Sequence, residues 1–428
     1  MRIVYLAAGA GGTYCGACMR DTLLARSLVE RGHDVEFLSL YTPVRSDRAL
    51  PGACRIFYGG INVYLQQHAG IFRHTPALFD RLFNSAWLLD FVGSHAVNTR
   101  PEDLGEMTIS VLKGPDGRQR KELRRLVDHL VEGERPDVVH ITNSMLSAIA
   151  PAVKERLDVP VVCCLQGEDV FIEQMGKPFS DEAVELIRRH AASVDAFVAP
   201  GEAYADTMTA FLAVDRSRIR IIRAGVDPAL SETDAAPPPD VFRIGYLSRV
   251  MREKGIDLLC DAFRLLEEES PGRAELAVAG EARGANRQVW HEQMTHLTEA
   301  GLADRVEYVG ALDLEGKTDF LKGLSVFCVP SRLNERQAVA TLEAQTVGVP
   351  VVLPDLGVFH EILALTGGGI LVEPDNPQAL AEALAGLRDD PEKRTALARA
   401  AREGARKHFS GTQMIEKTLA LYEEIRRA

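Results

Sequence analysis

The chain has 428 residues, of which 46% are hydrophobic and 26% are charged, and its formal net charge is −12. This length predicts two or three domains, at roughly 150 residues each. An acidic chain is a poor candidate for broad nucleic-acid binding, because a basic surface supplies most of that affinity. No apolar run reaches the roughly 20 residues that cross a bilayer, and the N-terminus lacks the long apolar core of a signal peptide.

The N-terminal residues predict a strand, a turn and a helix. The strand runs from Ile3 to Ala7, the turn contains Gly9, Gly11 and Gly12, and the helix runs from Cys18 to Glu30. Glycine lets a backbone approach a phosphate closely, and the following helix end carries partial positive charge. Many Rossmann-like folds have such a turn for packing alone, so both interpretations stay open.

The seven cysteines are an odd number in a large chain, which predicts reduced thiols in the cytoplasm rather than a disulfide framework. Cys15 and Cys18 form a C-x-x-C in the first turn. A zinc site would need two more ligands, which the other cysteines or several histidines could supply only if the fold brought them together. We therefore expect small buried or loop thiols that hold no metal.

Two further stretches have a recognisable pattern but an ambiguous role. Residues 76–91 place apolar side chains at helical spacing, which suits core or interdomain packing better than a lipid or acceptor groove. Residues 118–125 form a basic helix face, which a solvated surface explains more simply than membrane contact.

Two continuous apolar segments, Asp137 to Ile141 and Val159 to Leu165, are typical of parallel strands buried on both faces. His140 lies near the end of the first, and Gln166 follows the second. Glutamine can donate a hydrogen bond but cannot take a proton near neutral pH. We expect Gln166 to orient a ligand without acting as a base.

A linker, Ser231 to Asp240, contains three consecutive prolines and predicts a semi-rigid spacer. After it, a strand from Phe242 to Leu247 and a helix from Ile256 to Glu269 open a second Rossmann-like domain. The loop between them carries Arg249, with a fixed fork of donors, and Lys254, with a mobile charge; the pair suits a diphosphate. Two solvated cations are the alternative, but cations are unfavourable at a helix start unless an anion binds there.

The most informative stretch is residues 330–352, PSRLNERQAVATLEAQTVGVPVV. It predicts a loop and a helix, 338–346, between strands at 326–329 and 349–353, with Glu335 in the loop and Glu343 on the helix. Helix N-termini attract anions, and carboxylates accept sugar or ribose hydroxyls. An ordinary βαβ crossover with solvated glutamates is the alternative.

The spacing of these glutamates resembles the E-x7-E element of family 4 retaining glycosyltransferases. There the element reads roughly P-S-x-x-E-G-F-G-L-x-x-L-E-A, followed by G-x-P-V-V. The loop 248–255 also resembles the family's G-R-L-x-x-x-K-G, and residues 224–227 resemble its N-G-V-D turn, with Ala224 in place of the asparagine. The matching residues of the glutamate element are Pro330, Ser331, Glu335, Leu342, Glu343, Ala344, Gly348, Pro350, Val351 and Val352.

Two further departures from the family's pattern lie at expected site residues. The G-F-G segment, which normally brings bare backbone close to the donor's phosphate and sugar, reads Arg336-Gln337-Ala338 here. Gln166 stands where the family usually has a histidine beside the donor sugar. The first departure leaves the local geometry around Glu335 open.

The resemblance implies an α/β protein with the GT-B fold, in which two Rossmann-like doubly wound domains face a central cleft. It implies a retaining transfer of sugar from a nucleotide-diphosphate sugar to a hydroxyl acceptor, with no metal. The expected catalytic residues are Glu335, Arg249, Lys254 and Gln166. The expected donor-binding residues are Gly11, Gly12, Arg249, Lys254, Gln337, Ala338, Val339 and Glu343.

We expect an acceptor domain at 1–232, a linker at 233–241, a nucleotide-sugar domain at 242–410, and a final helix at 411–428 that crosses back to the first domain. The expected location is the cytoplasm, and contact with the inner membrane face is left open. An epimerase or hydrolase on the same fold, and a non-catalytic nucleotide-sugar binding protein, are the alternative functions. The sugar, the base, the acceptor and the oligomeric state are not predicted.

Overall fold

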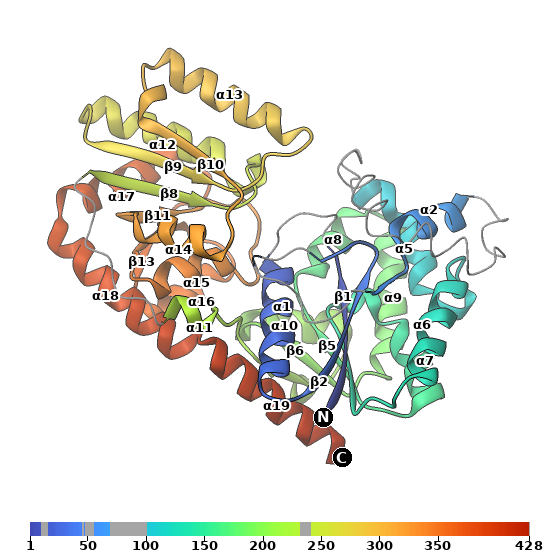
Figure 1. Cartoon of the computed structure of the whole chain (residues 1–428). Coiled ribbons are helices and arrows are strands. Elements are labelled where there is room, and N and C mark those ends of the chain that lie inside the picture. The colour runs from blue at the N-terminus through green and yellow to red at the C-terminus, as the bar shows by residue number, and fades with distance from the viewer. Residues whose placement is uncertain (10–15, 45–46, 48–54, 69–100, 232–240, 428) are drawn as a thin grey trace. The chain divides into compact units, whose positions relative to one another are not determined.

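The computed structural model describes residues 1–9, 16–44, 47, 55–68, 101–231 and 241–427. The chain divides into two compact units (Figure 1). Unit 1 comprises Met1–Ile222 and Ile415–Ala428, and unit 2 comprises Arg223–Met414. Each unit is a parallel sheet covered by helices, and each is described here by itself.

In the described part of unit 1, seven parallel strands form one sheet with the order β3-β2-β1-β4-β5-β6-β7. Their apolar segments are buried on both faces, as the sequence predicts. The order reverses between β1 and β4, and ligands bind at the carboxyl ends of strands near such a point. The strands are β1 (Arg2–Ala8), β2 (Asp34–Leu40), β3 (Arg55–Phe57), β4 (Val138–Ile141), β5 (Val161–Cys164), β6 (Ala196–Ala199) and β7 (Ile219–Ile221).

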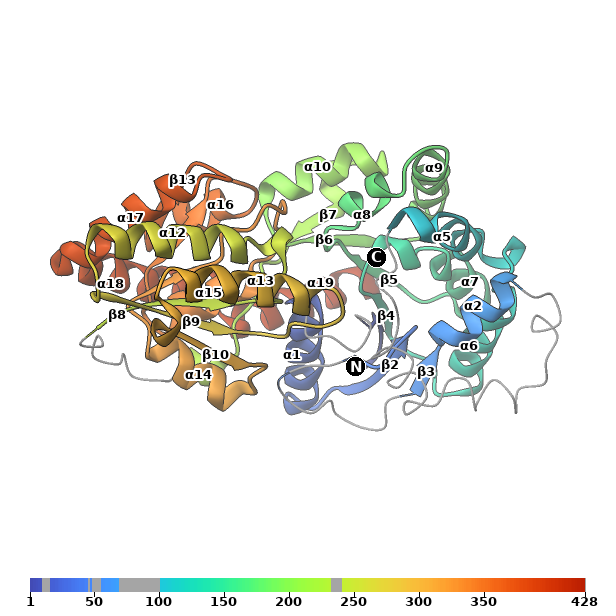
Figure 2. The ribbon, with the colours of Figure 1, turned by 90° about the horizontal axis from the view of Figure 1, so that it is seen from above.

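The longer helices of unit 1 pack on its sheet, and Figure 2 shows α9 and α10 next to each other beside α8. The last helix, α19, begins within unit 2, and from Ile415 onward it belongs to unit 1. The helices are α1 (Gly16–Glu30), α2 (Gly60–His68), α5 (Gly105–Leu112), α6 (Arg120–Glu132), α7 (Ile149–Leu157), α8 (Glu168–Gln174), α9 (Phe179–Ala191), α10 (Glu202–Leu212) and α19 (Gly411–Arg427).

Unit 2 has a parallel sheet with the order β10-β9-β8-β11-β12-β13 among its described residues. This is the order of a doubly wound nucleotide-binding fold, and its reversal lies between β8 and β11. The strands are β8 (Phe242–Leu247), β9 (Ala274–Ala279), β10 (Val306–Gly310), β11 (Val326–Cys328), β12 (Val351–Pro354) and β13 (Gly369–Val372).

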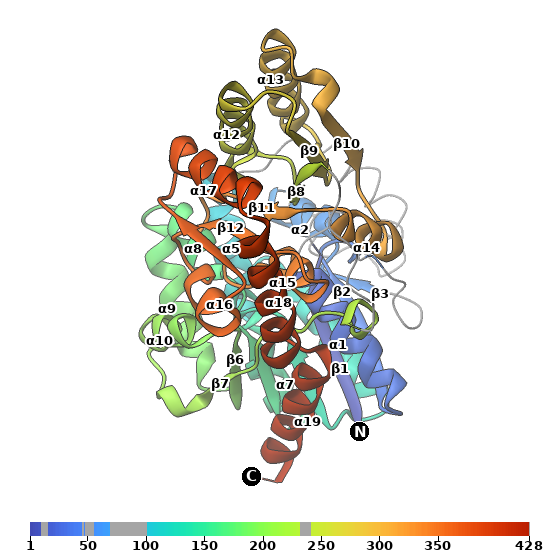
Figure 3. The same ribbon diagram turned by 90° about the vertical axis from the view of Figure 1, so that its left-hand side faces the viewer.

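Helices cover the sheet of unit 2 as well, and Figure 3 shows α15 and α16 beside α18, against which both pack. No helix in the described part of the chain is both long enough and apolar enough to cross a membrane. The helices of unit 2 are α11 (Pro228–Ser231), α12 (Ile256–Glu269), α13 (Asn286–Glu299), α14 (Leu314–Lys322), α15 (Val339–Thr346), α16 (Phe359–Thr366), α17 (Pro377–Asp389) and α18 (Pro391–His408).

The predicted elements match the structure best where their pattern is long. Strand β8 and helix α12 have the predicted bounds, and α19 runs from Gly411 to Arg427, the last residue that the structure describes. The helix predicted from residue 338 starts one residue later, and the strands around it are shifted or shortened by one or two residues. The predicted linker at 233–241 and the apolar stripe at 76–91 lie almost wholly outside the described residues, so the domain boundaries stay a prediction.

Candidate active site

The loop of residues 248–255 leaves the carboxyl end of β8 and leads into α12. The buried Tyr246 hydroxyl donates a hydrogen bond to the carbonyl oxygen of Arg249 at 2.8 Å, which fixes the start of the loop. Gly255 ends the loop with φ +73°, and a Cβ there would lie 1.9 Å from the carbonyl oxygen of Pro330. Only glycine fits this approach, so the loop is held against the end of β11.

Arg332 joins this loop to the loop that follows β11. Its backbone N–H donates to the carbonyl oxygen of Glu253 at 2.9 Å. Its guanidinium forms a bidentate ion pair with Asp257, at 2.8 and 3.0 Å, and binds Asp375 at 2.7 Å. A bidentate ion pair fixes the orientation of the two side chains as well as their distance. The two loops therefore form one structural element.

Two of the cations on this element are the expected site residues Arg249 and Lys254. Arg249 is exposed, and its guanidinium makes no ion pair with any residue that the structure describes. The Lys254 ammonium forms an ion pair with Oε1 of Glu335, and both side chains are mostly buried. The expected site residues Arg249, Lys254 and Glu335 therefore lie on adjoining loops at the carboxyl edge of β8 and β11.

The carboxylate of Glu335 is held next to Lys254 by further contacts of its own loop. Its Oε1 also accepts a hydrogen bond from the Ser331 hydroxyl at 2.8 Å, and its carbonyl oxygen accepts from the backbone N–H of Val358 at 3.1 Å. Gly357 packs against the same turn with φ +60°, where a Cβ would lie 2.4 Å from Oδ1 of Asn334. The loop thus brings Glu335 next to Lys254, although the G-F-G glycines are missing.

Ala338 keeps the backbone conformation that a glycine would favour. It caps α15 in the left-handed region, with φ 48° and ψ 47°. No side chain caps the first turn of α15, which begins at Val339, or that of α12, so backbone N–H groups of both helices can bind an anion. Gln337, before the cap, is 9% exposed, and its Oε1 has no hydrogen-bond partner among the residues that the structure describes.

We expect Ala338→Gly to stabilise the protein by about 0–1.5 kcal/mol. Left-handed backbone costs a non-glycine residue roughly 1–2 kcal/mol, and glycine removes this cost from the folded state. Glycine also makes the unfolded chain more flexible, which offsets about 0.4–1 kcal/mol of the gain in stability. Ala340→Gly, two residues into the helix, is the matched control and should destabilise by about 0.5–1 kcal/mol. Urea unfolding of both variants measures the difference, and equal destabilisation by the two glycines would refute the strain at Ala338.

Glu343 lies on the inner face of α15 and is only 6% exposed. Its Oε1 is 2.5 Å from the ammonium of Lys317, which comes from α14 and is 5% exposed. The two charges are therefore buried as a pair. Lys317 was not singled out from the sequence, because one lysine in an amphipathic helix normally lies at the surface.

Lys317→Met should cost roughly 3–5 kcal/mol of stability, because it leaves the Glu343 carboxylate buried without its cation. The double variant Lys317→Met/Glu343→Gln removes both charges and should recover most of that loss. Chemical denaturation of the two variants and the wild type measures this coupling. A single variant as stable as the wild type would show that the pair contributes nothing.

In unit 1 a second group of polar residues lies at the carboxyl ends of β4 and β5. Gln166 follows β5, and its Nε2 donates to Oγ1 of Thr142 at 3.0 Å and to Oδ1 of Asp21 at 3.2 Å. Asp21 comes from α1, is 2% exposed, and also accepts from the Tyr5 hydroxyl at 2.6 Å. The side-chain N–H groups of Gln166 therefore already donate hydrogen bonds within the protein.

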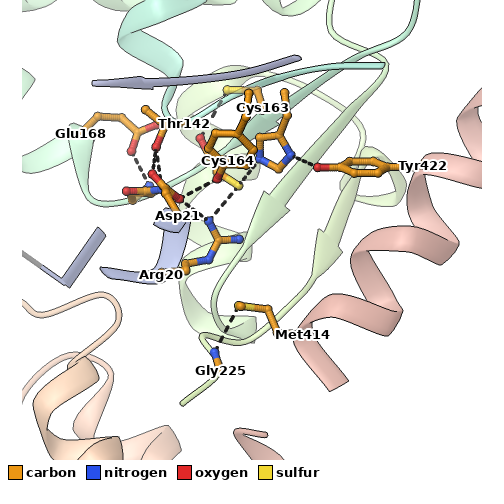
Figure 4. Close-up of polar contacts among 12 residues, drawn as sticks. Arg20, Asp21, Thr142, Cys163, Cys164, Glu168, Gly225, Met414 and Tyr422 are labelled. Atoms are coloured by element: carbon orange, nitrogen blue, oxygen red, sulfur yellow. Dashed lines mark hydrogen bonds and ion pairs between the residues drawn. The ribbon is translucent and has the colours of Figure 1, made fainter. Parts of the chain in front are cut away.

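The same cluster continues into the core, and Figure 4 shows Asp21 between Thr142 and Arg20. Arg20 lies 3.2 Å from Asp21 and 3.1 Å from the sulfur of Cys164. His140 contacts that sulfur at 2.9 Å and, through Nδ1, the hydroxyl of Tyr422 on α19 at 2.5 Å. Burial lowers the pKa of His140 well below its usual range and raises the pKa of Cys164 to about 11, so both groups are uncharged.

The remaining predictions concern the glycine-rich turn after β1 and the cysteines beside it. Gly11, Gly12 and Cys15 lie outside the described residues. Cys18 is buried and forms no disulfide. Among the residues that the structure describes, no three His, Cys, Asp or Glu side chains gather closely enough to hold a metal ion. The metal-free thiols stay a prediction.

Comparison with known proteins gives consistent matches over both units. The glycosyl transferase 4-like domain matches residues 22–225, and the glycosyl transferases group 1 family matches residues 232–404. The D-inositol 3-phosphate glycosyltransferase 1 of Catenulispora acidiphila is 26% identical over 400 residues, or 85% of this chain and 90% of the relative. The chain belongs to the family 4 type of GT-B glycosyltransferases.

Two further similarities agree with this assignment. The lipopolysaccharide core biosynthesis mannosyltransferase LpsB of Rhizobium meliloti is 34% identical over 191 residues, which cover 43% of this glycosyltransferase and 52% of LpsB. The crystal structure of Anabaena HepE in complex with UDP has a TM-score of 0.67 and 18% identity, and covers 99% of this chain and 100% of HepE. The predicted family, the fold of two Rossmann-like domains and the predicted enzyme class are confirmed.

The structure of this glycosyltransferase brings Lys254 and Glu335 into contact and places Arg249 on the same loop. It puts Ala338 and Val339 at the start of α15, with Glu343 one turn further along. Sequence reasoning missed Lys317, Asp21 and Thr142. For Asp21 a signal existed, because Arg20-Asp21 is a charged pair among the otherwise uncharged buried residues of α1.

Proposed function

We propose that this glycosyltransferase binds the diphosphate of its donor at the carboxyl edge of β8 and β11 and transfers the sugar with retention. The observation that carries the proposal is the contact of Lys254 with Glu335, which joins the loop that carries Arg249 and leads into α12 to the loop that leads into α15, with no side-chain cap on either helix. Fixed cations and backbone N–H groups of this kind stabilise an anion that develops in the transition state. They are the reason to propose that no metal is needed.

The reaction breaks the bond between the anomeric carbon and the diphosphate oxygen, and the electron pair leaves with the diphosphate. The acceptor hydroxyl attacks the same face of the sugar, and its proton passes to the departing phosphate oxygen. Arg249 and Lys254 stabilise the negative charge on the leaving group. The carboxylate of Glu335, held by Ser331, stabilises the positive charge that develops on the sugar.

Glu343 accepts the ribose hydroxyls of the donor, and Lys317 fixes its carboxylate from the opposite helix. In this proposal residues 242–410 hold the donor, and residues 1–232 supply Gln166 and most of the acceptor contacts. The complex of HepE with UDP supports a uridine nucleotide as the first donor to test. The name of the C. acidiphila relative supports D-inositol 3-phosphate as the first acceptor to test.

A donor panel tests the proposal. Thermal unfolding with UDP-, GDP- and ADP-sugars identifies the donor, since a ligand at about 100 times its Kd adds roughly 2.7 kcal/mol of stability. Transfer from that donor is then followed by mass spectrometry with an acceptor panel that begins with D-inositol 3-phosphate. We expect a glycosylated product with the donor's anomeric configuration by NMR, formed equally well in excess EDTA. An inverted product, or activity that EDTA abolishes, would contradict the proposal.

A further inference from the structure

The side-chain amide of Gln166 has one orientation that its neighbours allow. The Thr142 hydroxyl donates to Oδ2 of Asp21, so its oxygen is available to accept from Gln166. A carboxylate can only accept hydrogen bonds. Turning the amide over would place its carbonyl oxygen against two oxygens that both need a donor. The Nε2 group therefore faces Asp21 and Thr142, and Oε1 faces away from them.

Asp21 is itself held in place as an acceptor. Arg20 is 3% exposed and lies 3.2 Å from Asp21, so the buried guanidinium requires the carboxylate as its counter-charge. The Tyr5 hydroxyl supplies a further donor at 2.6 Å. Arg20 and Tyr5 bind the carboxylate on one side, and Gln166 and Thr142 bind it on the other. These hydrogen bonds fix its orientation.

We propose that Asp21 is a positioning residue for sugar transfer: with Thr142 it occupies both N–H groups of Gln166, so that the amide presents only its carbonyl oxygen to the substrate. This rests on the proposed function, in which Gln166 belongs to the substrate site. Among the described residues no donor reaches Oε1 of Gln166. The group that it recognises must then donate a hydrogen bond, which on a sugar nucleotide or a polyol acceptor means a hydroxyl.

Gln166→Glu tests the orientation without any ligand. The introduced carboxyl faces Asp21, and two carboxylates at this distance cannot both be ionised in a buried site. The pKa of the introduced carboxyl is therefore raised in the folded state. The variant is most stable at acid pH, where this carboxyl is protonated, and it loses stability as the pH rises through the raised pKa. Relative to the wild type, its Tm should fall by about 5 °C or more between about pH 5 and pH 8.

The two tyrosines, Cys164 and His140 beside this cluster stay uncharged in that interval. Burial raises the pKa values of Tyr5 and Tyr422 well above the usual range, and those of Cys164 and His140 are shifted as described above. The charged or titratable groups around Asp21 and Gln166 are Tyr5 on β1, Arg20 on α1, His140 on β4, Cys164 on β5, Glu168 on α8 and Tyr422 on α19.

The double variant Asp21→Asn/Gln166→Glu exchanges donor and acceptor between the two positions. The side-chain amide introduced in place of Asp21 can donate to the new carboxylate, and the net charge of the cluster is restored, so the pH dependence of the Tm should disappear. The carboxylate also offers an acceptor oxygen to the substrate. The double variant should therefore recover kcat/KM to within about 3-fold of the wild type, which a merely structural role would not predict.

Kinetics test the substrate contact, with UDP-glucose as donor probe, D-inositol 3-phosphate as acceptor probe, and released UDP as the measured product. Gln166→Ala removes the acceptor oxygen without a clash, so kcat/KM should fall roughly 10-fold, while the difference between its Tm and that of the wild type should not change with pH. An effect that also appears with water as the acceptor assigns the hydroxyl to the donor sugar. An effect confined to D-inositol 3-phosphate assigns it to the acceptor.

Two results would overturn the proposal alone: a Tm of Gln166→Glu that follows the wild type at every pH, or UDP release by Gln166→Ala equal to that of an active wild type. A wild type that releases no UDP from any donor sugar would instead contradict the proposed function, and the proposal with it.

Discussion

Glu335→Gln is expected to lower kcat about 10²-fold with little change in the donor KM. The carboxylate is held by Ser331 and Lys254 at the edge of β11, and glutamine keeps its size while removing its charge. A charge that stabilises positive charge on the departing sugar acts mainly in the transition state, so its loss appears in kcat. Steady-state kinetics with the donor varied at saturating acceptor measure both constants.

Glu343→Gln is the matched control, because it makes the same chemical change eight residues further along. Hydrogen bonds to ribose hydroxyls exist equally in the ground and transition states, so this variant should mainly raise the donor KM. Its folded state is checked first, since Lys317 loses its buried partner. If Glu335→Gln changes only KM, or neither constant, Glu335 does not act on the transferred sugar.

Arg249→Ala is expected to weaken binding of the donor nucleoside diphosphate roughly 10- to 150-fold. A charge-assisted hydrogen bond contributes about 1.5–3 kcal/mol, and the exposed guanidinium has no ion-pair partner in the described structure that would compete for it. For the same reason the variant should keep the stability of the wild type. Isothermal titration calorimetry with the diphosphate gives the affinity directly.

Arg252→Ala is the control for Arg249. Arg252 lies on the same loop and is exposed, but its guanidinium binds Glu292 at 2.6 Å. Its removal changes the net charge of the loop equally and should leave the affinity within about 2-fold, as expected for a screened surface charge. Equal losses for the two variants would show that the loop attracts the nucleotide only by its overall charge.

Much of the fold could be predicted because the two sheets consist of continuous apolar strands between amphipathic helices. Strand β8 and helix α12 have the expected bounds, since a strong pattern and clear turn residues mark both. The helix after Glu335 begins one residue later than predicted because Ala338 adopts left-handed backbone, a conformation that an alanine in the sequence does not indicate. Local sequence cannot show where such strain is tolerated, because the surrounding loops enforce it.

The site was predictable only as far as motifs extend along the chain. Arg249, Lys254 and Glu335 were found because family patterns surround each of them. Lys317 and the contact between Asp21 and Gln166 were not, since Glu343 is 26 residues from Lys317 and Gln166 is 145 residues from Asp21 in sequence. Their contacts depend on which strands are neighbours, and that order appears only in the folded sheet.

Calorimetric titration of the wild type with uridine, UMP and UDP, and then with the adenosine and guanosine series, tests the central claim most directly. The claim is that the β8 and β11 edge of unit 2 binds a diphosphate. In the series that binds, the step from monophosphate to diphosphate should raise the affinity at least about 10-fold, because the second phosphate reaches Arg249 and Lys254. A diphosphate that binds no more tightly than its monophosphate in every series would contradict the claim.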